Sequence, residues 1–186
     1  KADSEDESDA LIAPIAAEVR ARLGDYVFGS NQQTMSDVVT ELLAARSLRL
    51  AVVETTTRGE LAQWLSSAKQ GTVAFAGGTV LTNAQALRDT LDLNSTDLSV
   101  FPSQAVADAA AQAVRARHKA DLGLAVIGLQ DTGSTDAPPV YFCLADDRGT
   151  VQSPPRPGRS GVAGRGWLMH VALDLVRRRL LGLPII

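Results

Sequence analysis

The chain has 186 residues, 45% of them hydrophobic and 21% charged, so it is long enough to bury the core of one α/β domain. Its net charge of −3 argues against nucleic-acid binding, because affinity for a phosphate backbone depends on a cationic surface. Apolar runs such as residues 122–129 are far shorter than the roughly 20 residues that span a bilayer. We therefore expect a cytoplasmic protein that binds neither nucleic acid nor membrane.

Cys143 is the only cysteine, so no internal disulfide can form. The two histidines, His118 and His170, are too few to complete a structural zinc site with it, and we expect neither a metal nor a cofactor. His118 lies among charges at the end of a predicted helix, where a solvated or dipole-stabilising role is expected. His170 lies one turn from Asp174 in the last predicted helix, which favours a packed or interface residue over a catalytic one.

The first residues are acidic, since residues 3–9 contain five of the 21 acidic side chains and no apolar anchor. We interpret residues 1–10 as a solvated linker or tail and residues 11–186 as one α/β domain. This domain begins with two predicted helices, because apolar residues recur at helical spacing over 11–23 and again over 35–45.

Strands and helices then alternate along the rest of the chain. The predicted strands are almost continuous apolar runs, which is typical of strands buried on both faces of a sheet. They occupy residues 48–53, 72–80, 122–129, 140–145 and 149–153, and helices are predicted over 58–68, 83–91, 103–118 and 165–181. This alternation predicts a three-layer α/β/α sandwich with a mostly parallel or mixed central sheet.

The stretch VETTTRGEL, residues 53–61, joins a predicted buried strand to the next helix. Ligands gather at this end of a strand in open α/β sheets, where helix N-termini offer unpaired N–H groups. The three threonines that begin at Thr55 could hold a phosphate or carboxylate or supply a nucleophile, and Arg58 could pair with a bound anion. The simpler interpretation is a threonine that caps the helix, with Glu60 in the first turn and Arg58 on the surface.

A hydroxyl nucleophile also needs a base within hydrogen-bond reach and donors that stabilise the oxyanion. The only lysines are Lys1, Lys69 and Lys119, which lie in the tail or near the far ends of predicted helices. No Thr–Lys dyad is therefore visible, and both interpretations of the threonines remain open.

The order of several motifs resembles the C-terminal domain of the CinA family of competence/damage-inducible proteins. The family reads approximately LAVAESCTGG and then GGVVAYSNEAK, and this chain has LAVVETTTRGEL at 50–61 and AGGTVLTNAQAL at 76–87. ADLGLAVIGL at 120–129, RPG at 156–158 and VALDLVRRRL at 171–180 extend the similarity to nearly everything after residue 10. Active members are nicotinamide mononucleotide deamidases. The resemblance thus implies hydrolysis of a nucleotide carboxamide to a carboxylate and ammonia through an acyl-enzyme.

The resemblance places Thr55 at the position of the family's nucleophilic serine, where the extra methyl group crowds attack. It also implies a set of substrate-binding residues, namely Thr56, Thr57, Arg58, Gly59, Gly77, Gly78 and Gly128. The family's tyrosine maps onto Thr82 or Leu81 and its lysine onto Leu87 or Ala86, so this chain has neither. Loss of the lysine removes a proton transfer worth roughly 10²- to 10⁴-fold in rate.

The glycine-rich loop of the family is altered as well. Where the family has TGIAGPGGG, this chain has IGLQDTGS at 127–134, so larger residues replace those that let a backbone approach a nucleotide. Asp131 in this loop would repel a phosphate group. These substitutions fall together at the expected site.

Three functional hypotheses follow from the resemblance, and in each we expect a nucleotide or other small-molecule ligand and a homo-oligomer. The first, which we favour, is a degenerate enzyme domain with weak or lost activity, kept as a ligand-binding or structural partner of the nucleotide-hydrolase domain that lies upstream in full-length members. The second is an active amidohydrolase in which Thr55 attacks the amide, with Arg58 or a residue of another subunit compensating. The third is an enzyme reassigned to a different amide or phosphorylated ligand.

Overall fold

The computed structural model describes residues 4–94, 96–129, 138–159 and 161–186. The chain divides into two compact units, Lys1–Gln33 and Thr34–Ile186, which are described separately.

The first unit contains helix α1 (Glu5–Leu23) and the short 3-10 helix η1 (Gly24–Tyr26). The sequence predicted that this helix begins at residue 11, but it begins at Glu5. Part of the acidic segment interpreted as a tail is therefore helical. The physical reason is that negative charge in the first turns of a helix interacts favourably with the partial positive charge of the N-terminus.

The second unit begins with a capping box that fixes the start of helix α2 (Met35–Ala44). The Thr34 hydroxyl accepts a hydrogen bond from the Asp37 N–H at 3.1 Å, and the Asp37 carboxylate accepts one from the Thr34 N–H at 3.2 Å. Such an arrangement satisfies two of the N–H groups that a helix start leaves unpaired. The same carboxylate accepts a hydrogen bond from the Lys69 N–H at 3.1 Å, which ties α2 to a segment 32 residues away.

The sheet of the second unit has five strands in the order β2-β1-β3-β4-β5. Its strands are β1 (Leu50–Glu54), β2 (Phe75–Val80), β3 (Leu122–Ile127), β4 (Val140–Asp146) and β5 (Gly149–Arg156). β1 runs parallel to both of its neighbours, whereas β4 is antiparallel to β3 and β5. The sheet is therefore mixed, as predicted. The predicted strand over 72–80 starts only at Phe75, because the residues before it form the short helix α4 (Gly71–Ala74).

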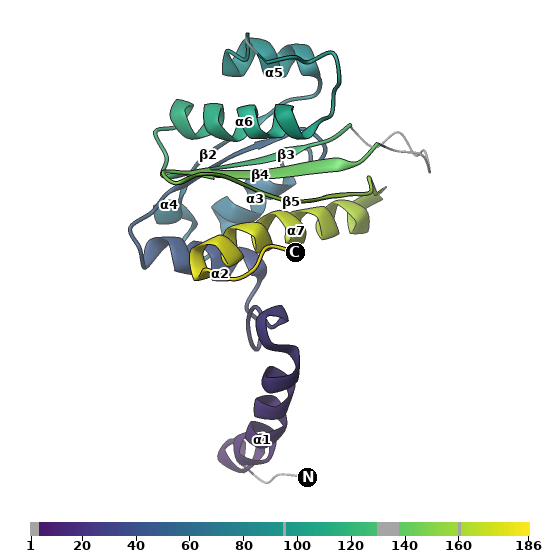
Figure 1. The fold of residues 1–186 in the computed structure, drawn as a ribbon. Coiled ribbons are helices and arrows are strands. Elements are labelled where there is room, and N and C mark those ends of the chain that lie inside the picture. Colours follow the sequence, from purple (N-terminus) through teal and green to yellow (C-terminus); the bar gives the residue numbers. More distant parts are fainter. Residues whose placement is uncertain (1–3, 95, 130–137, 160) are drawn as a thin grey trace. The chain divides into compact units, whose positions relative to one another are not determined.

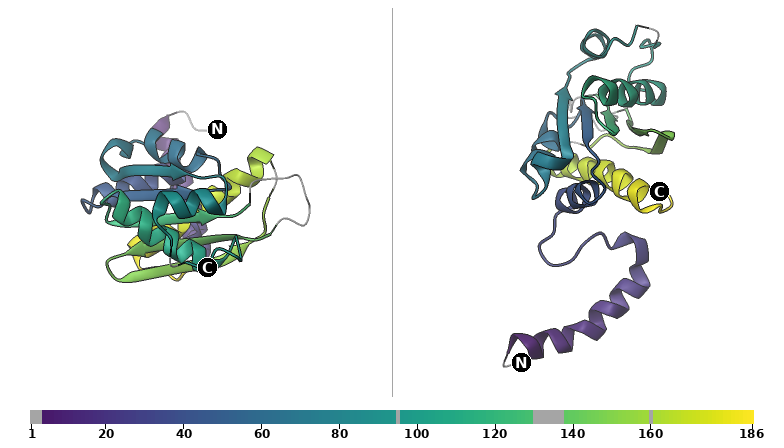
Figure 2. Two further views of the ribbon diagram at one scale, coloured as in Figure 1. Left: turned by 90° about the horizontal axis from the view of Figure 1, so that it is seen from above. Right: turned by 90° about the vertical axis from the view of Figure 1, so that its left-hand side faces the viewer.

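Helices cover both faces of this sheet, as Figure 1 shows, and the two further views in Figure 2 show the same layers. One layer contains α5 (Ala84–Leu91) and α6 (Gln104–Arg117). The other contains α2, α3 (Glu60–Ser67) and α7 (Gly161–Leu181). These findings confirm the predicted α/β/α sandwich. Among the described residues, no helix is both long enough and apolar enough to cross a bilayer.

The alternation of side chains along β1 explains why two separate cores form. Leu50 and Val52 pack into the cluster shared with α2, α3 and α7, and Ala51 and Val53 pack into the cluster shared with α5 and α6. Successive side chains of a strand point to opposite faces, so an entirely apolar strand must be covered on both. Every residue of β1 is buried, including the charged Glu54 at its end.

The two edges of the sheet differ in composition. β2 forms one edge and contains the pair Gly77-Gly78, whereas β5 forms the other and contains Pro154 and Pro155. The ladder between β4 and β5 shifts register near these prolines, between the partners of Val140 and Phe142.

Candidate functional site

Thr55 follows directly after β1, at the carboxyl end of an interior strand of the sheet. Its N–H donates to the Val126 carbonyl at 3.1 Å, which extends the ladder with β3 by one residue. Its hydroxyl donates to the Gly128 carbonyl at 2.6 Å and accepts from the Gly128 N–H at 2.9 Å. The residue is 1% exposed. The hydroxyl group is thus held from both sides by one backbone unit and shielded from solvent.

Glu54 occupies the helix N-terminus at which the sequence predicted a ligand. Its buried carboxylate accepts hydrogen bonds from the Leu61 N–H at 3.3 Å, the Ala62 N–H at 3.0 Å and the Thr57 hydroxyl at 2.5 Å. An internal anion therefore binds the N–H groups that would otherwise face a phosphate. Sequence reasoning did not identify this role, although an acidic residue between a wholly buried strand and a helix start is the signal that indicates it.

The turn between β1 and α3 requires left-handed backbone at two consecutive residues. Arg58 has φ 56° and Gly59 has φ 91°, and the Glu60 N–H closes the turn on the Thr57 carbonyl at 3.0 Å. Glycine adopts this conformation freely, but at Arg58 it costs about 1–2 kcal/mol. The helix begins from Gly59, which has no side chain to cap it, so the predicted threonine cap is wrong and Glu54 satisfies the N–H groups instead.

The first turn of α3 is joined to α7 by an ion pair. The Glu60 carboxylate accepts a hydrogen bond from Arg165 Nε at 2.6 Å, and both side chains are largely buried. Arg58, by contrast, is exposed. One turn further along, the Trp64 ring meets the edge of the His170 ring with 5.2 Å between centroids, which accounts for His170 as a contact between helices.

Gly77 and Gly78 lie within the edge strand, opposite Ala51 and Val52, and both allow other residues to approach closely. A Cβ atom on Gly77, where φ is 147°, would lie 2.7 Å from His118 Nδ1. One on Gly78 would lie 2.8 Å from the Ala62 Cβ. The glycine pair therefore has a complete explanation in packing.

His118 lies at the C-terminal end of α6, as the sequence predicted, but it is half-buried over β2 rather than fully solvated. Its Nε2 lies 3.2 Å from the Thr79 hydroxyl. Burial, assisted by the nearby Arg117 charge, lowers the pKa of His118 below its usual value. The contact joins residues that are far apart in sequence, and only the path of α6 across the sheet brings them together.

Gly128 lies against the threonines that follow β1. A Cβ atom on this residue would lie 2.9 Å from Val140 Cγ2 and 3.4 Å from the Thr56 side chain. Thr55, Thr56 and Thr57 are all buried beside it. The structure therefore brings these four residues together at the carboxyl ends of β1 and β3, whereas Gly77 and Gly78 lie within the edge strand β2.

The positions that the resemblance gives to the family's tyrosine and lysine hold neither residue. Leu81 and Leu87 are buried in the core with α5 and α6, whereas Thr82 is exposed and Ala86 is partly buried. Asn83 caps α5, since its side-chain oxygen accepts a hydrogen bond from the Ala86 N–H at 2.9 Å. Within the described residues, the Thr55 hydroxyl makes both of its hydrogen bonds to the backbone of Gly128, so no basic side chain contacts it as a general base would.

Three other features bear on the site: the altered loop, possible metal ligands and a cavity. Asp131 and the rest of the altered loop fall outside the described residues. Within the described ranges, no group of three or more possible metal ligands lies close together. A cavity of about 910 Å³ is lined partly by Arg115, Lys119 and Asp146. It lies near the end of α6 and the turn between β4 and β5, away from Thr55.

Comparison with known proteins shows where this domain belongs. A family model described as the CinA C-terminal domain matches residues 32–180. CinA-like proteins of Acaryochloris marina and Frankia casuarinae are 32% and 35% identical to the chain, over 97% and 96% of its length. The matches cover only 45% and 42% of these relatives, so the chain spans less than half of their length.

Solved structures share the fold. A CinA superfamily protein of Klebsiella pneumoniae superposes with a TM-score of 0.71 at 21% identity, over 82% of this chain and 99% of its own. The competence/damage-inducible protein CihA of Agrobacterium tumefaciens superposes with a TM-score of 0.64 at 20% identity, over 83% and 98%. Because the family model covers most of the sequence, the chain belongs to the CinA family and contains its C-terminal domain.

Proposed function

We propose that this CinA domain has weak or no amidohydrolase activity and acts as a ligand-binding or structural domain. The observation that carries the proposal is the state of the Thr55 hydroxyl, which is buried and engaged by Gly128 as both donor and acceptor. A nucleophile must present its oxygen to the substrate and transfer its proton to a base. Here the proton lies in a 2.6 Å hydrogen bond to a backbone carbonyl, which is a very weak base.

The surroundings of Thr55 support the same conclusion. The resemblance would place the tyrosine and lysine that assist catalysis at Thr82 and Leu87, or at Leu81 and Ala86, and neither pair supplies a phenol or a base. The N-terminus of α3, which could otherwise bind a substrate phosphate, already binds the Glu54 carboxylate. The Thr55 hydroxyl thus contributes to the stability of the fold. Of the residues named in this paragraph, only Thr55 keeps the placement of a nucleophile, at the carboxyl end of β1.

The competing function is an amidohydrolase that uses Thr55 as its nucleophile, with a base supplied from elsewhere. It would require the hydroxyl to leave Gly128, which would leave a buried N–H without its acceptor, at a cost of about 1–3 kcal/mol before any chemistry. As a structural domain, the chain would instead hold copies of itself, or an upstream nucleotide-hydrolase domain, in place.

Ammonia release from nicotinamide mononucleotide tests the proposal directly. The purified chain is assayed at high protein concentration beside Thr55→Ala and Thr55→Ser. We expect all three proteins to show the same background, because no base activates the hydroxyl. Turnover that is present in the native chain, lost in Thr55→Ala and increased in Thr55→Ser would instead establish a working amidohydrolase. Titration calorimetry with the same nucleotide then separates ligand binding from a purely structural role.

A further inference from the structure

Strand β2 lies at the edge of the sheet, with a neighbouring strand on one side. Within the described residues it pairs with β1 alone. From Gly77 onward its register with β1 is regular, and the Leu81 N–H just beyond it donates to the Glu54 carbonyl at 3.0 Å. Successive residues of a strand direct their backbone groups to opposite sides, so the N–H and C=O groups of Gly78 and Val80 face away from β1. These groups can bond to solvent or to a strand of another chain.

The Lys1–Gln33 unit does not contain such a strand. Its described residues, 4–33, form α1, η1 and turns, without a β-strand. A helix pairs its N–H and C=O groups within itself, so α1 cannot complete the hydrogen bonds of a sheet edge. A strand that pairs with the outer side of β2 therefore comes from another molecule.

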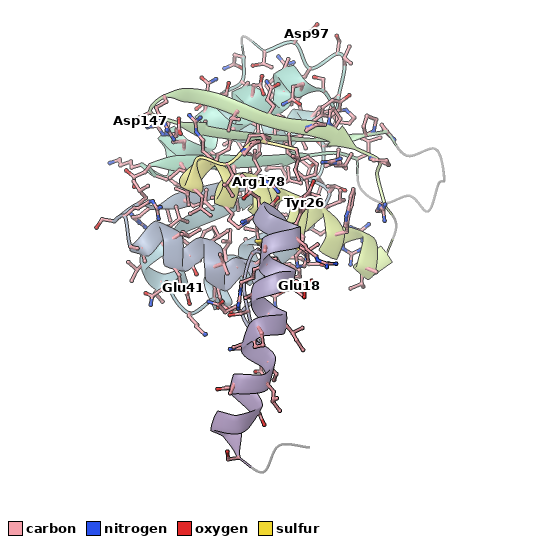
Figure 3. The ribbon with its side chains drawn as sticks, turned by 60° about the horizontal axis from the view of Figure 1, so that its bottom comes forward. Glu18, Tyr26, Glu41, Asp97, Asp147 and Arg178 are labelled. Carbon is pink, nitrogen blue, oxygen red and sulfur yellow. The ribbon has the colours of Figure 1, made fainter. Side chains whose placement is uncertain are left out.

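The segment that surrounds β2 is depleted of charge. Residues 61–87 contain a single charged side chain, Lys69, whereas 21% of the whole chain is charged. This segment forms most of α3, all of α4 and β2, and the first turn of α5, and both α3 and α4 pack against β2. Other elements carry charged side chains, for example Glu41 of α2 and Asp147 in the turn after β4, which Figure 3 labels. Depletion of charge is the compositional mark of the core of a protein interface.

The same segment places apolar side chains on the surface of the Thr34–Ile186 unit. Val73 of α4 is 56% exposed and Val80 of β2 is 47% exposed. Gly78 is exposed as well, and because it has no side chain, the backbone of another strand can approach β2 closely there. The edge thus combines open backbone groups with a neutral, partly apolar surround.

We propose that two copies of this chain join through β2, so that their two sheets become one continuous sheet. A two-fold axis perpendicular to the sheet relates the copies, and the two β2 strands run antiparallel because such an axis reverses strand direction. Each copy then presents the same surface to the other. A charged surface would repel its own copy across this axis, and the charge-poor segment around β2 avoids that repulsion.

The assembly that results is a closed dimer. Pairing of β2 with β5 of a second copy would leave a free edge at each end and continue into a filament, whereas pairing of β2 with β2 uses the same edge of both copies and stops there. The proposal uses no property of Thr55, so it does not rest on the proposed function.

Light scattering of the purified chain over a range of concentrations tests the proposal, with Val80→Lys as the disrupting variant. Lysine on an edge strand is one of the means by which proteins prevent the addition of another strand. The matched control is Val162→Lys, the same exchange at a 74% exposed valine of α7, a helix that packs on β3, β4 and β5. Amide exchange at Gly78 and Val80 of the native chain is measured in parallel at high and low protein concentration.

We expect the native chain and Val162→Lys to have the mass of a dimer, and Val80→Lys to have the mass of one chain at the same concentration. In the native chain, dilution below the dimer range should speed exchange of the Gly78 and Val80 N–H groups by about tenfold or more. This second measurement needs no variant, so it decides the question even if Val80→Lys fails to fold. A dimer that persists in Val80→Lys would overturn the proposal, because another surface would then hold it together. A native chain that stays monomeric, or whose exchange at both N–H groups is unchanged by dilution, would overturn it as well.

Discussion

Replacement of Thr55 by valine tests the two-sided hydrogen bond with Gly128. Valine has nearly the shape of threonine, so the exchange removes the hydroxyl and leaves the packing unchanged. The Gly128 N–H, 2.9 Å from the hydroxyl oxygen, loses its acceptor, and the Gly128 carbonyl, 2.6 Å away, loses its donor. Each buried group left without a partner costs about 1–3 kcal/mol, so the free energy of unfolding should fall by about 2–6 kcal/mol.

The control is Thr55→Ser, which separates the loss of the hydrogen bonds from other effects of changing this residue. Serine keeps the hydroxyl and loses one methyl group, which contributes about 1 kcal/mol when buried. Urea unfolding of both variants can be followed by tryptophan fluorescence, because Trp64 and Trp167 are the only tryptophans and both belong to the Thr34–Ile186 unit. The reasoning is refuted if the valine variant is as stable as the native chain, or if the serine variant is the less stable of the two.

Two further predictions concern the edge strand and the acid stability of the domain. Gly77→Ala should lower the free energy of unfolding by about 1–3 kcal/mol, since the new Cβ would meet His118 at 2.7 Å, whereas Gly166→Ala, with nothing within 4 Å, should be neutral or stabilising in the same urea assay. Arg179 hydrogen-bonds the Asp146 carboxylate and lowers its pKa to about 2, below the roughly 3.9 of an aspartate in an unfolded chain. The stability that this ionised carboxylate contributes to the fold is therefore present above pH about 4 and is lost as the pH falls toward 2. Arg179→Met should therefore flatten the loss of stability across this window, and an unchanged acid titration of stability would contradict the assignment.

Much of the fold follows from local patterns, whereas the roles of the site residues do not. The apolar run of β1 predicts a strand buried on both faces because its residue types alone require two cores. An acidic residue between a buried strand and a helix start indicates a role for Glu54, but which N–H groups its carboxylate binds depends on how the turn at Arg58 and Gly59 directs α3. The sequence also could not show that Leu87 faces the core, since a short helix such as α5 is oriented by tertiary packing.

The prolines of β5 have a consequence for how the protein avoids self-association through its sheet. An exposed strand edge is a template on which another chain can add by backbone hydrogen bonding. Pro154 and Pro155 carry no N–H, so the β5 edge offers fewer donors to an incoming strand, and the register shift beside them interrupts the regular spacing that such a strand would need. The opposite edge, β2, has no proline between Phe75 and Val80. Sheet extension by an added strand is therefore disfavoured at β5, and β2 is the edge that lacks this protection.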